Sequence, residues 1–152
     1  MEITTLSKLQ EETEIIFTHD GMLVFIPSCW IVEGEDRLSY TTLVRLIECC
    51  REYHWQKDVI PGCSGALVDS ISKSLVANFI KPILAGSQIK ITYSVLSVGD
   101  KSYRIGFQLQ SSNDCLHAKF ELIQIFYDPM EHKSIEPPIG VRERLLAICI
   151  NE

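Results

Sequence analysis

"SYTTLVRLIECCREYHW", residues 39–55, is the stretch whose apolar pattern decides the fold. Side chains spaced three and four residues apart share one face of an α-helix, and here they are Leu43, Leu46, Ile47, Cys50 and His54. Ser39 is the expected N-cap, because its hydroxyl can accept a hydrogen bond from a first-turn N–H group. Glu35 and Asp36 precede it, where the helix dipole favours negative charge. The stretch therefore predicts one long helix with a buried face.

The segments next to this helix carry strand and turn signals. Residues 13–32 predict two strands that turn at His19-Asp20-Gly21, because Asp-Gly between apolar runs is a strong hairpin signal. Residues 1–12 are expected to form only a loosely structured or short lead-in. "VIPGCSG" (59–65) breaks the helix and predicts a loop, since it combines a proline with two glycines.

The rest of the chain has a β pattern until its last residues. Four strands are expected, joined by turn-forming segments, at residues 66–80, 87–98, 102–111 and 115–127. An extended exit and a short helix end the chain. A hairpin, one long helix and a four-stranded antiparallel meander predict an α+β fold, and 152 residues fit a single domain over residues 1–152.

Composition excludes several classes of protein. The chain is 46% hydrophobic and 22% charged, a globular balance. Its net charge of −6 argues against a nucleic-acid surface, which needs clustered Lys and Arg. The apolar run at residues 22–32 is interrupted and far shorter than the ~20 residues of a membrane span. Because acids crowd the first 20 residues, no secretory signal is expected, and a cytoplasmic location is favoured.

The six cysteines invite a disulfide or metal interpretation. They lie at positions 29, 49, 50, 63, 115 and 149, without a CxxC or CxxH pair. Structural zinc sites rely on such spacings, so neither a metal nor a cofactor is expected. Free thiols in a reducing cytoplasm are the plainer interpretation.

One motif in the second half of the chain resembles a known strand pattern. "FIKPILAGSQIKI" (79–91) is similar to the central strand of a family of acyl-CoA thioesterases. Phe79, Pro82 and Gly86 stand where that family has an aromatic residue, a proline and a glycine, whereas Ser87 stands where Asp is usual.

Two further motifs fit the same family in the same order. "SVGDKSYRIGFQL" (97–109) resembles the turn that opens the next strand, and Glu48 and Arg51 fall on an E-x-x-R near the end of the helix. Over about residues 14–140 the chain thus resembles the 4-hydroxybenzoyl-CoA thioesterase-like branch of the hotdog-fold thioesterases. The resemblance implies an antiparallel sheet wrapped around one long central helix.

The resemblance also places an active-site loop before the helix. Counted back from Arg51, the family's catalytic Asp falls on Glu33, its Gly on Asp36, and its last loop position on Tyr40. Glu33 would then be base or nucleophile, and Tyr40 would position the thioester or a water. Backbone N–H groups from Ser39 to Thr41 would face the thioester carbonyl as oxyanion donors. The alternative for these acids is that they only cap and solubilise the helix, and for Tyr40 that its ring packs under the helix start.

Glu48 is the second candidate base. At 100° per residue it lies at the edge of the core stripe with Tyr40, Val44 and Arg51. A carboxylate there is often desolvated, which raises its pKa toward that of a useful base. The competing interpretation is a structural ion pair between Glu48 and Arg51 three residues apart.

A thioester substrate also needs groups that hold coenzyme A or a phosphopantetheine arm. Arg37 is a candidate for a phosphate or an acyl carboxylate, and Lys81, Lys101 and Arg104 flank the family-like turns. In each case a solvated side chain is the alternative. In the family such contacts often come from a neighbouring subunit, so the resemblance implies a homodimer or homotetramer.

The function expected from the sequence is hydrolysis of an acyl-CoA or acyl-carrier-protein thioester, in polyketide or fatty acid metabolism. One alternative is a dehydratase or hydratase of acyl thioesters, but residues 55–116 and the active-site loop contain no His for it. The other is a non-catalytic acyl-binding hotdog protein, favoured by the missing Asp, Gly and His of the loop.

Overall fold

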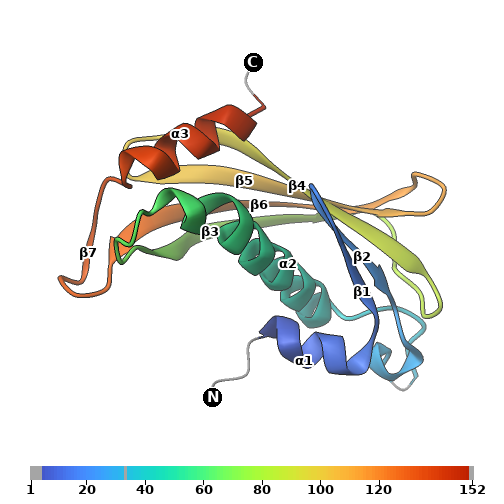
Figure 1. Ribbon diagram of the computed structural model, residues 1–152. Coiled ribbons are helices and arrows are strands. Elements are labelled where there is room, and N and C mark those ends of the chain that lie inside the picture. The colour runs from blue at the N-terminus through green and yellow to red at the C-terminus, as the bar shows by residue number, and fades with distance from the viewer. Residues whose placement is uncertain (1–4, 33, 151–152) are drawn as a thin grey trace. The chain divides into compact units, whose positions relative to one another are not determined.

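The computed structural model describes residues 5–32 and 34–150 of the chain (Figure 1). The helices are α1 (Thr5–Glu12), α2 (Tyr40–His54) and α3 (Ile139–Ile148), with short helical turns η1 (Ser28–Trp30), η2 (Trp55–Val59) and η3 (Ile60–Gly62). The strands are β1 (Ile15–Thr18), β2 (Gly21–Phe25), β3 (Asp69–Phe79), β4 (Gln88–Val98), β5 (Ser102–Ser111), β6 (Leu116–Asp128) and β7 (Lys133–Ser134). The predicted α+β class and the positions of the four later strands are confirmed. The expected meander is wrong, because β3 neighbours β6 in the sheet and not β4.

The strands form one sheet in the order β1-β2-β4-β5-β6-β3, with β7 paired to β6. β1 and β2 are antiparallel, and the pair Thr18–Gly21 closes their predicted turn around Asp20. β2 continues antiparallel onto β4, where Gly21 lies opposite Thr92. A side chain at Gly21 would collide with the Ile91 carbonyl, so this close pairing of strands requires glycine. β3 is the last strand of the path, and one of its edges is therefore not paired within the described sheet.

Two expectations near the N-terminus were wrong. Residues 1–12 were expected to form only a loosely structured or short lead-in, but Thr5–Glu12 is an α-helix that buries Leu9 completely. Burial of Leu9 against the rest of the chain helps to hold this short helix, which would be marginal alone. The second strand was expected to run to residue 32, but β2 ends at Phe25. Pro27, which follows soon after, has no N–H group for the ladder and opens η1.

By the density of its contacts the chain forms two compact units. The first unit is Met1–Tyr53, Asn78–Thr92 and Phe107–Lys119, and the second is His54–Ala77, Tyr93–Gly106 and Phe120–Glu152. The single domain over residues 1–152 stays a prediction. Within the described residues, no helix is long and apolar enough to cross a membrane.

In the first unit, α2 buries the predicted face. Leu46, Ile47 and Cys50 are fully buried, and Leu43 nearly so. Near the other end of the helix, the Tyr53 hydroxyl donates to the Thr18 carbonyl at 2.6 Å. The Tyr53 ring stacks on Phe17 with 4.5 Å between centroids. These contacts hold α2 against the β1–β2 hairpin.

In the second unit, the helix does not stop where it was expected to. It continues through η2, a π-helical turn in which the Ile60 N–H donates to the Trp55 carbonyl, and then through the 3₁₀ turn η3. The loop expected at 59–65 therefore begins only at Cys63. Pro61 is tolerated in η3, because the first turn of a helix does not use its missing N–H group.

Candidate functional site

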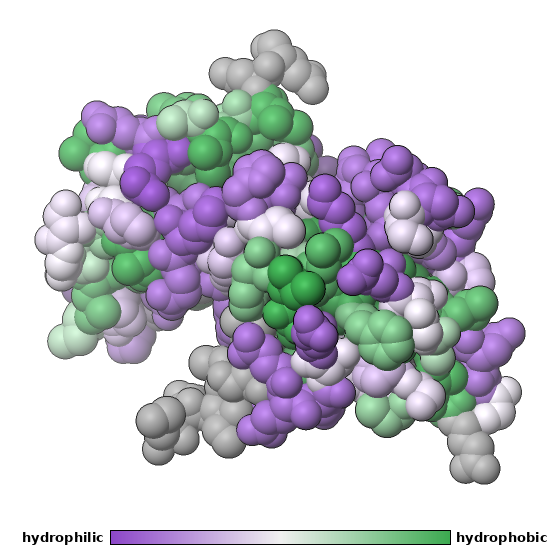
Figure 2. Space-filling model, turned by 45° about the vertical axis from the view of Figure 1, so that its right-hand side comes forward, coloured by the Kyte–Doolittle hydropathy of each residue, from purple (hydrophilic) through white to green (hydrophobic). Residues whose placement is uncertain are grey.

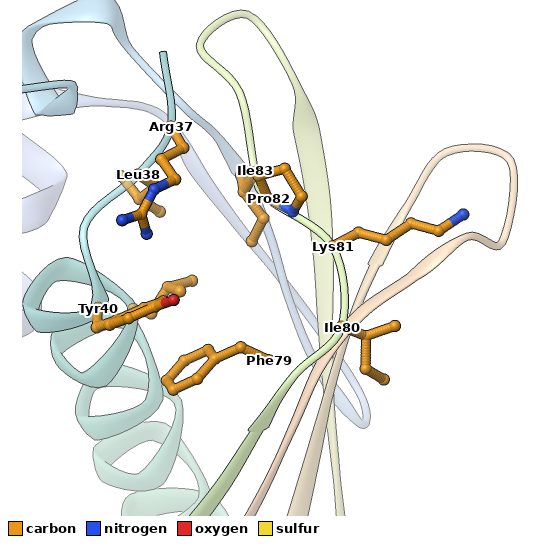
Figure 3. A pocket seen from close by; sticks show the side chains of 9 residues that line it. Arg37, Leu38, Tyr40, Phe79, Ile80, Lys81, Pro82 and Ile83 are labelled. Atoms are coloured by element: carbon orange, nitrogen blue, oxygen red, sulfur yellow. The ribbon is translucent and has the colours of Figure 1, made fainter. Parts of the chain in front are cut away.

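A pocket of about 200 Å³ opens at the N-terminal end of α2, within the first unit (Figure 3). Two segments form it: the approach to α2 with the first turn of that helix, and the end of β3 with the stretch that follows it. Its lining residues are Arg37, Leu38, Tyr40, Leu43, Phe79, Ile80, Lys81, Pro82 and Ile83. The pocket therefore lies where the sequence placed the active-site loop.

Backbone hydrogen bonds fix the two segments that line the pocket. The Leu38 N–H donates to the Ile83 carbonyl at 2.8 Å, which ties the approach to α2 to the second segment. The second segment is tied in turn to β6, because the N–H groups of Ile80 and Lys81 both donate to the His117 carbonyl at 2.9 and 3.1 Å. The pocket is therefore built on paired backbone.

Ser39 is the N-cap of α2, as predicted. Its hydroxyl oxygen accepts a hydrogen bond from the Thr42 N–H at 3.2 Å, and its carbonyl accepts one from the Leu43 N–H at 3.1 Å. This leaves the N–H groups of Tyr40 and Thr41, at the start of the helix, without an intrahelical acceptor, as in any α-helix. The positive end of the helix dipole adds to their attraction for an anion.

Three side chains form a stack at the mouth of the pocket. The Tyr40 ring lies on the Phe79 ring with 4.1 Å between centroids, and the Arg37 guanidinium lies 5.0 Å from the Tyr40 centroid. Figure 3 shows Arg37 and Phe79 directed at Tyr40 from the two segments of the pocket. Such a stack fixes the position of Arg37 through its attraction to the aromatic ring.

The charges at the pocket are unevenly placed. Arg37 is directed toward the ring stack, whereas Lys81 points away from it (Figure 3). The Lys81 ammonium donates to the Cys115 sulfur at 3.2 Å. None of the described residues that line the pocket is an acid. The pocket is thus apolar with a cationic rim.

Of the two candidate bases, only Glu48 is among the described residues. Glu33 lies outside the described residues. Glu48 is paired with Arg51, whose Nη2 donates to Glu48 Oε2 at 2.9 Å and whose Nε is within 3.3 Å of both carboxylate oxygens. Its side chain is 38% exposed, and it does not line the pocket. The contacts of Glu48 are those of the structural ion pair that the sequence left open.

Two other predicted binding residues belong to the second unit and do not line the pocket. Arg104 pairs with Glu121 across β5 and β6. The carbonyl of Lys101 accepts the Phe126 N–H at 2.9 Å. Their roles toward a substrate stay predictions.

The second unit holds a buried polar network that the sequence did not reveal. His54 Nδ1 lies 2.9 Å from Asp58 Oδ2, and its Nε2 lies 3.0 Å from the Tyr103 hydroxyl. The Tyr93 hydroxyl donates to Asp58 Oδ2 at 2.5 Å, and Lys57 donates to Oδ1 at 3.4 Å. Burial raises the pKa of the Asp58 carboxyl, but the hydrogen bonds from His54 and Tyr93, with the nearby cations, outweigh it and bring the pKa to about 2.

The signal for half of this network was present in the sequence. His54 and Asp58 are four residues apart, a spacing that brings side chains together on a helix. The two tyrosines come from β4 and β5, and no local pattern links them to the helix. The sequence predicts His54 on the buried face of the helix, and the structure adds its two partners, Asp58 and Tyr103.

The cysteines are all free thiols. Burial raises the pKa of Cys49 to about 12 and also raises the pKa values of Cys50 and Cys63, so these three thiols stay protonated at neutral pH. Within residues 5–32 and 34–150, no group of three His, Cys, Asp or Glu side chains is arranged to hold a metal ion. The cytoplasmic location stays a prediction.

Comparison with known proteins identifies the fold. No protein-family model matches the sequence, and no curated protein does. Among solved structures, a predicted thioesterase from Bacillus stearothermophilus has a TM-score of 0.74 at 14% identity, over 86% of this chain and 96% of that one. A Thermus thermophilus thioesterase complexed with coenzyme A and Zn has a TM-score of 0.69 at 15% identity, over 83% and 90%.

A third structure extends the comparison to a different thioesterase. It is the 1,4-dihydroxy-2-naphthoyl-CoA thioesterase from Synechocystis, with a TM-score of 0.70 at 8% identity over 84% of this chain and 95% of that one. At such low identities the likeness shows the fold, and it confirms the predicted hotdog fold.

Proposed function

We propose that the chain hydrolyses an acyl thioester of coenzyme A or of an acyl carrier protein in the pocket at the start of α2. The observation that carries the proposal is the pocket itself, where Arg37 is held over Tyr40 beside the first turn of a long helix. The fold is that of solved thioesterases, one of which is complexed with coenzyme A. An apolar pocket with a cationic rim suits an acyl group joined to an anionic carrier.

The start of α2 would supply the oxyanion donors. When the thioester carbonyl becomes tetrahedral, its oxygen gains negative charge that preorganised N–H groups can stabilise. The N–H groups of Tyr40 and Thr41 are the available ones, because Ser39 already accepts from Thr42 and Leu43. Arg37 would bind a phosphate or an acyl carboxylate of the substrate, and Tyr40 would position the thioester.

The base or nucleophile would be a glutamate that precedes the helix. Glu33 is the first candidate, because the sequence runs from it directly to Arg37 at the pocket rim. Glu48 follows Tyr40 by eight positions, about 12 Å along the helix at 1.5 Å per residue. It is also engaged by Arg51. Glu33 would take a proton from a water molecule that attacks the carbonyl, or would attack the carbonyl itself to form an anhydride that water then hydrolyses. In both cases the C–S bond breaks, and the thiolate leaves and takes up a proton.

The second candidate function is binding of acyl thioesters without hydrolysis. One observation favours it: the described lining of the pocket includes no carboxylate. If Glu33 does not act as a base, the pocket has the apolar lining and the cation for binding but no group to activate water.

Release of free thiol from a panel of acyl-CoA and acyl-carrier-protein thioesters separates the two functions. Turnover by the full chain with at least one substrate is expected. Glu33→Gln should lower kcat by about 10²-fold or more, the usual contribution of a general base, while Glu48→Gln should stay within a few-fold of wild type. Binding without turnover would establish the acyl-binding function, and full activity of both variants would overturn the carboxylate mechanism.

We also propose that the chain forms a homodimer through β3. An open strand edge presents unpaired N–H and C=O groups, a template for a second strand. Four large apolar side chains of β3 are exposed as well: Ile71, Leu75, Val76 and Phe79, of which Phe79 lines the pocket. Val76→Lys should therefore yield monomers in light scattering, and Met130→Lys, at an exposed turn outside β3, should not. A wild-type monomer at all concentrations would overturn this assembly.

A further inference from the structure

The end of the long helix in the second unit is held by a residue from far along the chain. Arg144 of α3 donates from Nε to the Asp58 carbonyl at 2.9 Å and from Nη2 to the Lys57 carbonyl at 3.2 Å. The last carbonyls of a helix have no intrahelical donor, and the negative end of the dipole attracts a cation. Arg144 therefore caps η2 from another element.

Several other attachments of α3 are polar or backbone contacts. At its start, Gly140 meets the backbone of Gly62 so closely that a Cβ on Gly140 would lie 2.6 Å from the Gly62 carbonyl oxygen. Arg142 donates to the Asp100 carbonyl at 2.6 Å. After its end, the Ile150 N–H donates to the Val95 carbonyl at 2.9 Å.

Apolar burial in the docking of α3 is limited to two side chains. Of its ten residues only Val141 and Leu145 are buried, whereas Ile139, Leu146 and Ile148 are exposed. Figure 2 shows hydrophobic surface gathered at the top of the view, over α3. A helix fastened by a few point contacts opens at a lower free energy than strands paired along their length.

The elements under this fastening carry the buried network. α3 packs against η2 and η3, and the carbonyl that Arg144 Nε holds belongs to Asp58, whose carboxylate binds His54 and Tyr93. Among the described residues, no buried side-chain N or O atom lacks a hydrogen-bond partner. Through Arg144, the docked position of α3 is thus linked to Asp58. The buried network around Asp58 makes all its hydrogen bonds within the protein and needs no water.

We propose that α3 and the two residues after it form a strap that opens as a unit while the sheet stays folded, with Arg144 as its latch. In the closed state Arg144 holds the carbonyls of Lys57 and Asp58. In the open state those carbonyls, and with them the Asp58–His54 pair, are reached by water. The strap is independent of the thioesterase proposal, because no residue of the pocket takes part in it.

Amide hydrogen exchange of the full chain, resolved by peptide, tests the strap. In the wild type, amides of residues 139–148 should exchange at least about ten-fold faster than those of residues 93–98 and 102–106. Arg144→Ala should speed exchange of the α3 amides by about ten-fold or more and leave the strand amides unchanged. Arg104→Ala is the matched control, because it removes an arginine ion pair with Glu121 in the same unit without touching α3.

A second variant approaches the strap from its other end. Gly140→Ala introduces a methyl group against Gly62 and should speed α3 exchange as Arg144→Ala does. Equal exchange rates of α3 and the strands in the wild type would overturn the proposal. So would an Arg144→Ala or Gly140→Ala variant in which α3 and the strands accelerate by the same factor, since that marks global unfolding.

Discussion

The two ends of the long helix both leave backbone groups without an intrahelical partner, N–H groups at the start and carbonyls at the other end, and their surroundings differ. At the start of α2, an apolar pocket with Arg37 at its rim is open, and the described lining holds no acid. At the other end, η2 is closed, with His54 fully buried and Asp58 almost so. Each end has backbone groups that the helix cannot satisfy itself.

The difference lies in what satisfies those groups. The carbonyls of Lys57 and Asp58 accept hydrogen bonds from Arg144, and the buried side chains of His54 and Asp58 bond to each other. At the start, Ser39 satisfies only part of the first turn. A helix end completed by the protein stabilises the fold, whereas an end left incomplete beside a pocket has capacity for a ligand. Changes at η2 should therefore affect stability, whereas changes at the start of α2 should affect binding.

The largest expected effect is on stability at the closed end. Asp58→Ala removes the acceptor shared by His54 and Tyr93 and leaves buried polar groups unpaired. The free energy of unfolding should fall by about 3 kcal/mol, as is usual when one partner of a buried pair is deleted. Urea denaturation measures it, with the exposed Asp69→Ala as control. A loss below that of the control would show that the network contributes nothing.

The same carboxylate predicts an acid dependence. The pKa of Asp58 is about 2 in the folded chain and about 4 when unfolded, so its contribution is present above pH 4 and is lost as the pH falls from 4 toward 2. About 2 kcal/mol of stability should disappear over this range. Asp58→Asn cannot titrate, so its unfolding free energy should fall less between pH 4 and pH 2. Parallel curves for wild type and variant would contradict the lowered pKa.

At the open end the expected effect is on binding and not on folding. Arg37→Ala removes the cation at the pocket rim, and the Kd for coenzyme A should rise about ten-fold, the loss of one charge-assisted contact. The midpoint of denaturation should change little. Lys90→Ala, an exposed cation of the same unit, is the control. Titration calorimetry measures the Kd for coenzyme A of both variants. Equal Kd values for Arg37→Ala and Lys90→Ala would show that Arg37 does not bind coenzyme A.

The smallest expected effect tests the ring stack. Phe79→Ala leaves Tyr40 without its 4.1 Å stacking partner, which is worth about 1 kcal/mol. The KM for acyl-CoA should rise about five-fold while kcat stays nearly constant, because the change affects binding more than chemistry. Phe25→Ala, at an exposed ring outside the pocket, should leave KM as it is. A fall in kcat alone would assign Phe79 a different role.

Much of the fold could be predicted because its signals are local. The spacing of Leu43, Leu46 and Ile47 predicts the buried face of α2, Ser39 the cap, and Asp20-Gly21 the hairpin turn. The helix over Thr5–Glu12 and the π-helical turn were missed, because packing against the rest of the chain decides them.

The part of the site that lies close to the helix in sequence could also be predicted, whereas its contacts with distant segments could not. Arg37 and Tyr40 precede or begin the helix, so sequence places them at its mouth. Phe79 was noticed only as a strand marker, because its contact with Tyr40 depends on how segments 39 residues apart pair. Tyr93 and Tyr103 reach Asp58 and His54 from distant strands in the same way. Spacing along a chain does not report which strand comes to lie beside a helix.

The most direct test is to map coenzyme A on the full chain by amide hydrogen exchange. Saturating coenzyme A should slow exchange in residues 37–43 and 79–83, the two segments that form the pocket. Residues 54–58 should be unaffected, because their polar groups are already satisfied within the protein. Protection confined to residues 54–58, or none at residues 37–43, would contradict the assignment of the open end of the helix as the thioester site.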